Sequence, residues 1–180
     1  MMDNDSDSFL CSIKEDIKRY KEHGRFEWYE PSLVVIINYR IGRALRSMRP
    51  AILGKILCLI HLPFYMFCSV FVGIHIPRGA RIGPGLRIWH FGCVILSPDS
   101  RIGTNCTLRQ GVTIGNRKGL HDVPVIGDNV DIGAGAKILG AITIGNNVSI
   151  GANAVVLIDV PDNCVAVGVP ARIVKRTEEE

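Results

Sequence analysis

The sequence predicts a mainly β protein in which a parallel β-helix follows an N-terminal α-helical region. Three observations support this fold class: aliphatic residues recur every six positions in the C-terminal part, the next residue is very often glycine, and helical spacing is confined to the residues before them. The aliphatic positions are Ile76, Ile82 and Ile88 and, after a slip of two residues, Leu96, Ile102, Leu108, Ile114, Leu120, Ile126, Ile132, Ile138, Ile144, Ile150 and Val156.

Each six-residue unit is expected to form one short strand and one tight turn, so that three units make one triangular coil. The aliphatic side chain points inward and stacks on its counterparts in the neighbouring coils, while successive strands pair in parallel at about 4.8 Å. Glycine and asparagine suit the turns because they tolerate positive φ. Residues 76–161 are long enough for about five such coils.

The residues before the repeat carry apolar side chains at helical spacing. Leu10, Ile13 and Ile17 predict a first helix from Phe9 to Trp28, Pro31 can open a second helix, and a third covers residues 51–70. We therefore expect a disordered segment at 1–8, a helical region at 9–72 and a β-helix domain at 73–161. A tail at 162–180 is expected to leave the β-helix.

Composition limits the possible functions. The net charge is only +4 and no basic block is interleaved with aromatic residues, so nucleic acid is not an expected partner. The six cysteines form no C-x-x-C pair and suggest no metal site, and the polar, acidic N-terminus does not resemble a signal peptide. We therefore expect reduced thiols and a cytoplasmic protein.

Residues 51–74 form a very apolar segment whose length approaches that of a membrane span. Lys55, His61 and Pro63 interrupt it, and Pro63 would kink or break a helix. We expect this segment to be buried in the fold or in a subunit interface. The alternative is peripheral association with the inner face of a membrane.

Two interruptions of the six-residue period carry histidines, His90 and His121. A regular prism has no pocket, so sites must lie in loops or in the grooves between prisms packed side by side, as in a homotrimer. Imidazole titrates near neutrality and can remove the proton from a hydroxyl that attacks a thioester, which suggests acyl transfer with His90 and His121 as catalytic residues. A covalent route through Cys93 or Cys106 is an alternative.

From about Asp16 to Lys175 the chain resembles the serine O-acetyltransferases, which belong to the hexapeptide-repeat acyltransferases. The resemblance rests on Tyr39-Arg-Ile-Gly-Arg, Gly111-Val-Thr-Ile-Gly, Ile132-Gly-Ala-Gly-Ala-Lys and Gly168-Val-Pro-Ala-Arg-Ile-Val. It implies a left-handed β-helix with acetyl-CoA as acyl donor, His90 as general base and His121 at the acceptor end. It also implies a homotrimer, or a dimer of trimers, with the donor in the groove between subunits. The residues that would then contact acetyl-CoA are Gly115, Asn116, Ala134, Ala152, Arg172 and Lys175.

Two departures from the family pattern bear on the acceptor. Trp89 and His75 stand where the family has aspartates that would hold an ammonium group, and Arg109-Gln-Gly-Val-Thr-Ile-Gly-Asn-Arg resembles a run in acetyltransferases of the colanic acid type. We therefore expect Trp89 and His75 to bind substrate and the acceptor to be a sugar or polysaccharide-precursor hydroxyl. Serine acetylation in cysteine biosynthesis is the alternative acceptor reading, and a non-catalytic trimeric scaffold is the alternative of another class.

Overall fold

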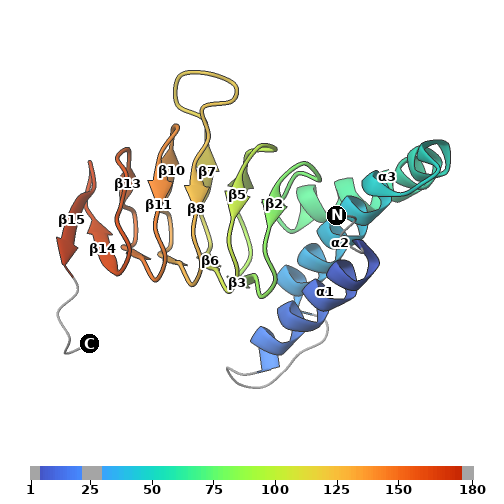
Figure 1. Ribbon diagram of the computed structural model, residues 1–180, viewed down its shortest axis with the longest axis horizontal. Helices are drawn as coiled ribbons and strands as arrows, with labels where there is room; N and C mark the ends of the chain where they lie inside the picture. The colour runs from blue at the N-terminus through green and yellow to red at the C-terminus, as the bar shows by residue number, and fades with distance from the viewer. Residues whose placement is uncertain (1–4, 22–29, 176–180) are drawn as a thin grey trace.

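The computed structural model describes residues 5–21 and 30–175 and consists of three helices followed by a parallel β-helix (Figure 1). The helices are α1 (Asp5–Lys21), α2 (Pro31–Ser47) and α3 (Ala51–Phe71). Helix α1 begins at Asp5, so the expectation of disorder fails for residues 5–8, while residues 1–4 lie outside the described part. The expected extension of this helix over residues 22–28 also falls outside it. Pro31 does open α2, as its fixed φ allows.

The β-helix has three parallel sheets, one for each side of a triangular prism. One sheet has the order β1-β4-β7-β10-β13, the second β11-β8-β5-β2 and the third β15-β14-β12-β9-β6-β3. The strands are β1 (Ile74–His75), β2 (Arg81–Ile82), β3 (Arg87–Trp89), β4 (Val94–Leu96), β5 (Arg101–Ile102), β6 (Thr107–Arg109), β7 (Thr113–Gly115), β8 (Val125–Ile126), β9 (Asp131–Ile132), β10 (Lys137–Leu139), β11 (Thr143–Ile144), β12 (Ser149–Ile150), β13 (Val155–Val156), β14 (Cys164–Val167) and β15 (Arg172–Lys175). The predicted repeat architecture of about five coils is confirmed.

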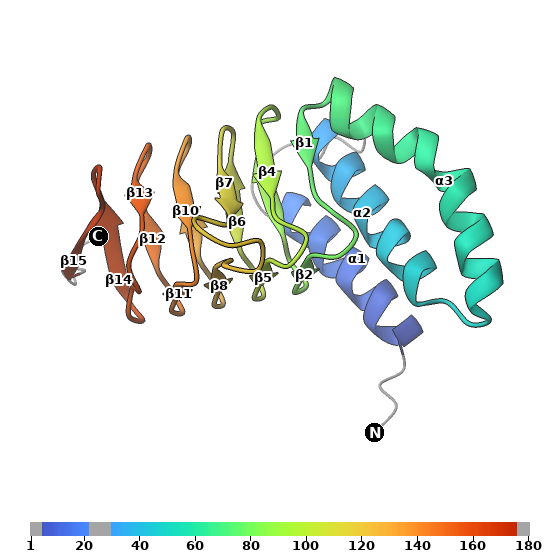
Figure 2. The ribbon, with the colours of Figure 1, turned by 90° about the horizontal axis from the view of Figure 1, so that it is seen from above.

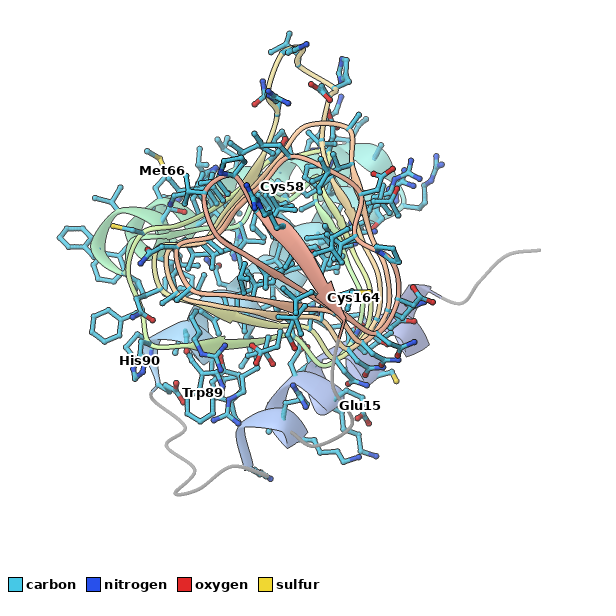
Figure 3. The ribbon with its side chains drawn as sticks, turned by 90° about the vertical axis from the view of Figure 1, so that its left-hand side faces the viewer. Glu15, Cys58, Met66, Trp89, His90 and Cys164 are labelled. Carbon is cyan, nitrogen blue, oxygen red and sulfur yellow. The ribbon has the colours of Figure 1, made fainter. Side chains whose placement is uncertain are left out.

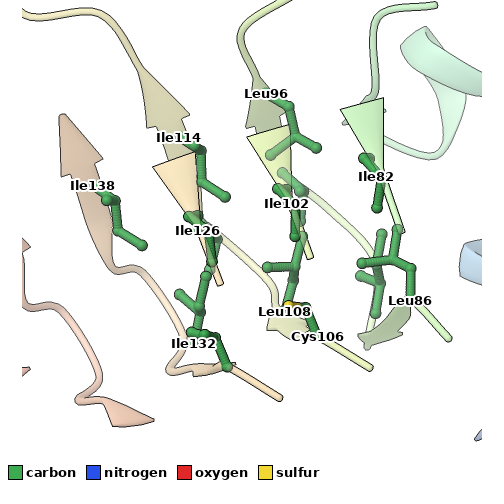
Figure 4. Packing of buried hydrophobic residues seen from close by; sticks show 14 of the residues in the cluster. Ile82, Leu86, Leu96, Ile102, Cys106, Leu108, Ile114, Ile126, Ile132 and Ile138 are labelled. Atoms are coloured by element: carbon green, nitrogen blue, oxygen red, sulfur yellow. The ribbon is translucent and has the colours of Figure 1, made fainter. Parts of the chain in front are cut away.

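The aliphatic residue of each hexad fills the interior of the prism. Ile102 pairs with Ile126, and Leu108 pairs with Ile132 in the next coil, so that equal side chains stack along the axis (Figure 4). Leu120 is the exception among the predicted core positions because it is 82% exposed. It belongs to residues 116–124, which leave the prism as a loop between β7 and β8 (Figure 1).

Asparagines in the left-handed region turn one edge of the prism. Asn129, Asn147 and Asn163 have φ between 55° and 59°. The side-chain amide of Asn129 donates to Asn147 at 3.1 Å, and that of Asn147 donates to Asn163 at 3.0 Å. The ladder therefore ties the turns of successive coils together.

The C-terminal segment does not leave the β-helix at residue 162 as expected. Strand β14 continues the third sheet in parallel with β12, and β15 then folds back antiparallel onto β14. Backbone hydrogen-bonding groups of the last coil are thereby paired instead of being left at an open edge. Residues 176–180 lie outside the described part.

The helical region is attached to the first coil by polar side chains. The Arg40 guanidinium donates to the Asp16 carboxylate at 2.8 Å and to the carbonyl of Ile82 at 2.6 Å, while Tyr39 donates to the carbonyl of Ala80 at 2.7 Å. Asp16 also accepts from the backbone N–H of Leu86 at 2.8 Å. Tyr39 and Arg40 are therefore structural, because their contacts fix α1 and α2 onto the prism.

Candidate active site

His90 lies at the corner that joins the third sheet to the first. Its side chain is exposed and its φ of 62° belongs to the left-handed region, as does the φ of Cys93 at 55°. Strand pairing places Gln110, Ala134 and Ala152 at the equivalent position of the following coils, two residues beyond Leu108, Ile132 and Ile150. We call this column, residues 90–93, 110–112, 133–136 and 151–154, the His90 corner.

Beyond Gln110, the coils that follow His90 carry small side chains at its corner. Ala134 and Ala152 are stacked one coil apart, and Ala152 is exposed. A long, thin ligand can approach the backbone where side chains stop at Cβ. The two alanines lie in the same column as the predicted base, and their contact with acetyl-CoA, which the family resemblance implies, stays a prediction.

Trp89 precedes His90 and is half-buried, and one face of its ring is covered by another side chain. The Arg87 guanidinium carbon lies 3.6 Å from the centroid of the Trp89 ring, and Arg87 also donates to the backbone carbonyl of Arg19 at 2.7 Å. One face of the indole is thus covered by a cation held in place from α1. This geometry leaves less room for a sugar ring to stack on Trp89.

His75 is exposed on β1, at the start of the first sheet. Its ring lies edge-on to Tyr65 of α3, with 6.3 Å between the ring centroids. Its role in substrate binding remains a prediction.

His121 lies on the loop of residues 116–124, at the corner between the first and second sheets. Its Nδ1 is 2.8 Å from Oδ2 of Asp99, and the two side chains are 89% and 48% exposed. Asp122 shapes this loop by accepting from the backbone N–H groups of Lys118 and Ala141. The sequence reasoning missed Asp99, whose only signal is its place in the turn that precedes β5.

A cleft of about 550 Å³ adjoins this histidine. Its charged lining consists of Asp99, His121, Arg46, Arg81 and Arg101. Arg81 and Arg101 are paired in register on β2 and β5, so their exposed side chains leave the same sheet one coil apart. The cleft therefore offers a carboxylate and several guanidinium groups within one small volume. We call residues 97–100, 116–124, 140–142 and 157–159 the His121 corner.

One chain does not bring the two predicted catalytic histidines together. His90 follows β3 and His121 follows β7, so they lie at different corners of the prism. Figure 3 looks along the prism and shows His90 and Trp89 at the lower left, whereas the loop that carries His121 projects at the top. A site that uses both imidazoles needs a neighbouring subunit, since symmetric packing of prisms can place one corner against another.

The other predicted donor contacts divide between these corners. Asn116 lies at the His121 corner and Gly115 ends β7 directly before it; an added Cβ at Gly115 would meet no atom closer than 4.0 Å. Arg172 is exposed on β15, and Lys175 ends that strand with a side chain outside the described part. These contacts stay predictions.

The cysteines do not favour a covalent route at Cys106. This thiol is fully buried, its Sγ lies 3.2 Å from the carbonyl oxygen of Gly127, and burial raises its pKa to about 11. A thiol of this kind is neither accessible nor ionised near neutrality. Within residues 5–21 and 30–175, no three His, Cys, Asp or Glu side chains are grouped as a metal would require.

Comparison with known sequences identifies the class of protein. Residues 124–157 match the family described as bacterial transferase hexapeptide, six repeats. The serine acetyltransferase of Staphylococcus xylosus is 51% identical over 180 aligned positions, which cover 93% of this chain and 79% of that protein. The serine acetyltransferase of Synechococcus elongatus is 36% identical over 149 positions and 82% of this chain, although the chain spans only 58% of that relative.

Solved structures agree with this relationship. A crystal structure of Neisseria gonorrhoeae serine acetyltransferase matches with a TM-score of 0.79 at 32% identity, covering 96% of this chain and 67% of that one. A serine acetyltransferase in complex with CoA matches with a TM-score of 0.76 at 33% identity, covering 94% and 69%. The chain is a hexapeptide-repeat transferase and, more narrowly, it belongs to the serine acetyltransferase family.

The expectation of a sugar or polysaccharide acceptor of the colanic acid type is wrong, because the relatives are serine acetyltransferases over most of this chain. That expectation assumed that replacing two aspartates by Trp89 and His75 leaves no carboxylate for an ammonium group. The structure contains another one, Asp99, beside His121 and the arginines of the cleft.

Proposed function

We propose that the protein is an acetyl-CoA-dependent serine O-acetyltransferase. The observation that carries the proposal is the match to serine acetyltransferases over 93% of the chain, at 51% identity. The structural similarity to a serine acetyltransferase solved with CoA supports the choice of donor. Two features of the fold, an exposed imidazole on a column of small residues and a cleft with both signs of charge, fit this chemistry.

His90 acts as the general base. Its imidazole accepts the proton of the serine hydroxyl as the hydroxyl oxygen attacks the thioester carbonyl of acetyl-CoA. The carbon–sulfur bond then breaks, the acetyl group remains on the serine oxygen, and the proton passes from His90 to the leaving thiolate. No covalent enzyme intermediate is needed, in accord with the buried state of Cys106.

The cleft beside His121 recognises the amino acid. A zwitterion requires a negative group for its ammonium and a positive group for its carboxylate. Asp99 supplies the first, and Arg81 and Arg101 supply the second. His121 is held by Asp99 at 2.8 Å and can donate through its other ring nitrogen to the substrate carboxylate.

A homotrimer completes the site. The His90 corner of one subunit faces the His121 corner of the next, so that donor, base and acceptor cleft meet in the groove between them. The rotation closes after three subunits and yields three equivalent sites.

The test measures release of free CoA thiol from acetyl-CoA with serine as acceptor, against threonine, homoserine and a panel of sugars. Serine is expected to give the highest kcat/KM, and His90→Ala to lower it by roughly 10²–10⁴. His61→Ala is a control because His61 lies on α3 and belongs to neither corner. Equal rates with sugars, or an unimpaired His90→Ala protein, would contradict the proposal.

A further inference from the structure

Helix α3 carries an apolar stripe that residues 5–21 and 30–175 leave uncovered. The stripe consists of residues spaced alternately by four and three, which places them on one face of a helix: Ile52, Ile56, Leu59, Pro63, Met66 and Val70. Ile52, Leu59 and Val70 are 73%, 69% and 70% exposed. Figure 2 shows α3 outermost, on the side of α2 that faces away from the β-helix. The expectation that this segment is buried in the fold is therefore wrong for the single chain.

The apolar surface is much wider than the stripe. Ile60, Phe67 and Phe71, which lie to one side of it, are 69%, 54% and 74% exposed. Lys55 is the only charged residue within α3. A helix that pairs with a second helix has a narrow apolar seam flanked by charged residues. A face this wide, which includes large aromatic residues, fits a liquid apolar phase better than one partner helix.

The charges around α3 are of one sign. None of the 17 Asp and Glu residues of the chain lies between residues 31 and 98. Arg49 and Lys55 stand exposed at the N-terminal end of α3, and no carboxylate pairs with them in the part of the chain that the structure describes. An anionic surface would therefore meet attraction and no opposing carboxylate.

The inner face of α3 is fixed to the protein. A side chain at Gly54 would collide with the carbonyl oxygen of Leu45, at 2.7 Å from its Cβ, and Tyr65 donates to the carbonyl of Ile76 at 3.1 Å. Arg78 contacts the ring of His61, with 3.0 Å between the nitrogens. Helix α3 is the one described helix that is long and apolar enough to cross a membrane. Crossing would carry these polar contacts and α2 into the hydrocarbon, so α3 fits the plane of the interface instead.

We propose that the outer face of α3 is a docking surface for the bilayer of an anionic phospholipid membrane. The apolar stripe and its aromatic neighbours enter the boundary between headgroups and acyl chains, while Arg49 and Lys55 contact the lipid phosphates. This inference does not depend on the acceptor of the acetyl group, because none of these residues lines either corner of the prism.

The test is flotation of the purified full chain with vesicles of phosphatidylcholine alone or mixed with phosphatidylglycerol. Binding to the mixed vesicles is expected, with weakening as salt rises. Arg49→Gln with Lys55→Gln should lower the partition coefficient on mixed vesicles roughly 25-fold, at about fivefold per cation. Leu59→Glu should lower it at least tenfold on both kinds of vesicle.

The matched control is Leu10→Glu, since Leu10 is 64% exposed on α1, away from α3. It should float as the unmodified chain does, and circular dichroism should show all variants folded. Lack of binding to mixed vesicles would overturn the proposal. So would sedimentation velocity showing that Leu59→Glu halves the particle mass without vesicles, because a second copy would then cover the face.

Discussion

Mixing two inactive variants tests whether the active site is shared between subunits. His90 and His121 lie at different corners of one prism, after β3 and after β7. If each site takes His90 from one subunit and His121 from its neighbour, His90→Ala and His121→Ala damage different halves of every site. Trimers that contain both variants should then hold some intact sites.

The recovered activity follows from counting. In an equimolar random mixture, a subunit that supplies an intact His90 to a site occurs with a probability of about one half, as does a neighbour that supplies an intact His121. About one quarter of all sites are therefore intact. His90→Ala alone should lower kcat by a factor on the order of 10²–10⁴. A mixture that recovers about one quarter of the activity of the unmodified protein therefore lies far above that background.

The assay is thiol release from acetyl-CoA with serine after the variants are unfolded together and refolded, with separately refolded variants as the baseline. An equimolar mixture of the double variant His90→Ala with His121→Ala and unmodified chain calibrates the count. About one quarter of its sites are intact if each site is shared between two subunits, and about one half if each site lies within one chain. Activity in the mixture of single variants that stays at the baseline would refute the shared site, since both histidines would then act within one chain.

Three further outcomes follow from the same structure. Asp99→Asn should raise KM for serine on the order of tenfold while KM for acetyl-CoA stays unchanged, because Asp99 orients His121 at 2.8 Å; equal changes in both constants would contradict this role. Asn147→Gly should lower the free energy of unfolding in urea by about 1 kcal/mol through loss of its ladder hydrogen bonds, and Asn147→Ala by about 1–2 kcal/mol more because of its φ of 55°; equal losses would refute the conformational argument. Cys106, with a pKa of about 11, should resist a thiol reagent at pH 8 in the native protein while exposed Cys93 reacts. The free energy of unfolding should fall as the pH rises from 9 to 11, because in this range only the unfolded chain releases the proton of the Cys106 thiol. Rapid labelling of Cys106 in the native protein would contradict its burial.

Much of the fold could be predicted because each six-residue unit has to meet the same physical requirement. Every coil needs an inward aliphatic residue and a turn that tolerates positive φ, so the sequence predicts the register wherever a coil meets this requirement. The prediction of a core position is wrong at Leu120, where an aliphatic residue falls on the six-residue period by coincidence within a loop. The prediction that the chain leaves the β-helix is wrong after residue 162, where the pairing of β14 with β12 depends on partners a coil away.

The burial of α3 could not be predicted because hydrophobicity does not say what covers a residue. Residues 51–70 were expected to be helical, and α3 covers them. Their apolar character predicts burial within the fold or in a subunit interface. The structure buries only the Gly54 and Cys68 side of this helix, so the residues that the structure describes leave the larger part of its apolar surface exposed.

The acceptor was misjudged for a reason that the geometry explains. The sequence can show that an aspartate is missing beside His90, but a recognition group need not lie beside the base along the chain. Asp99 reaches His121 across 22 residues of sequence, and Arg81 and Arg101 join it only because β2 and β5 pair in register. These residues occupy outward positions of ordinary hexads, where any polar side chain satisfies the fold. The interruptions of the period therefore indicate the histidines, whereas the groups that we propose to select the acceptor leave no mark on the repeat and are brought together only by the stacking of the coils.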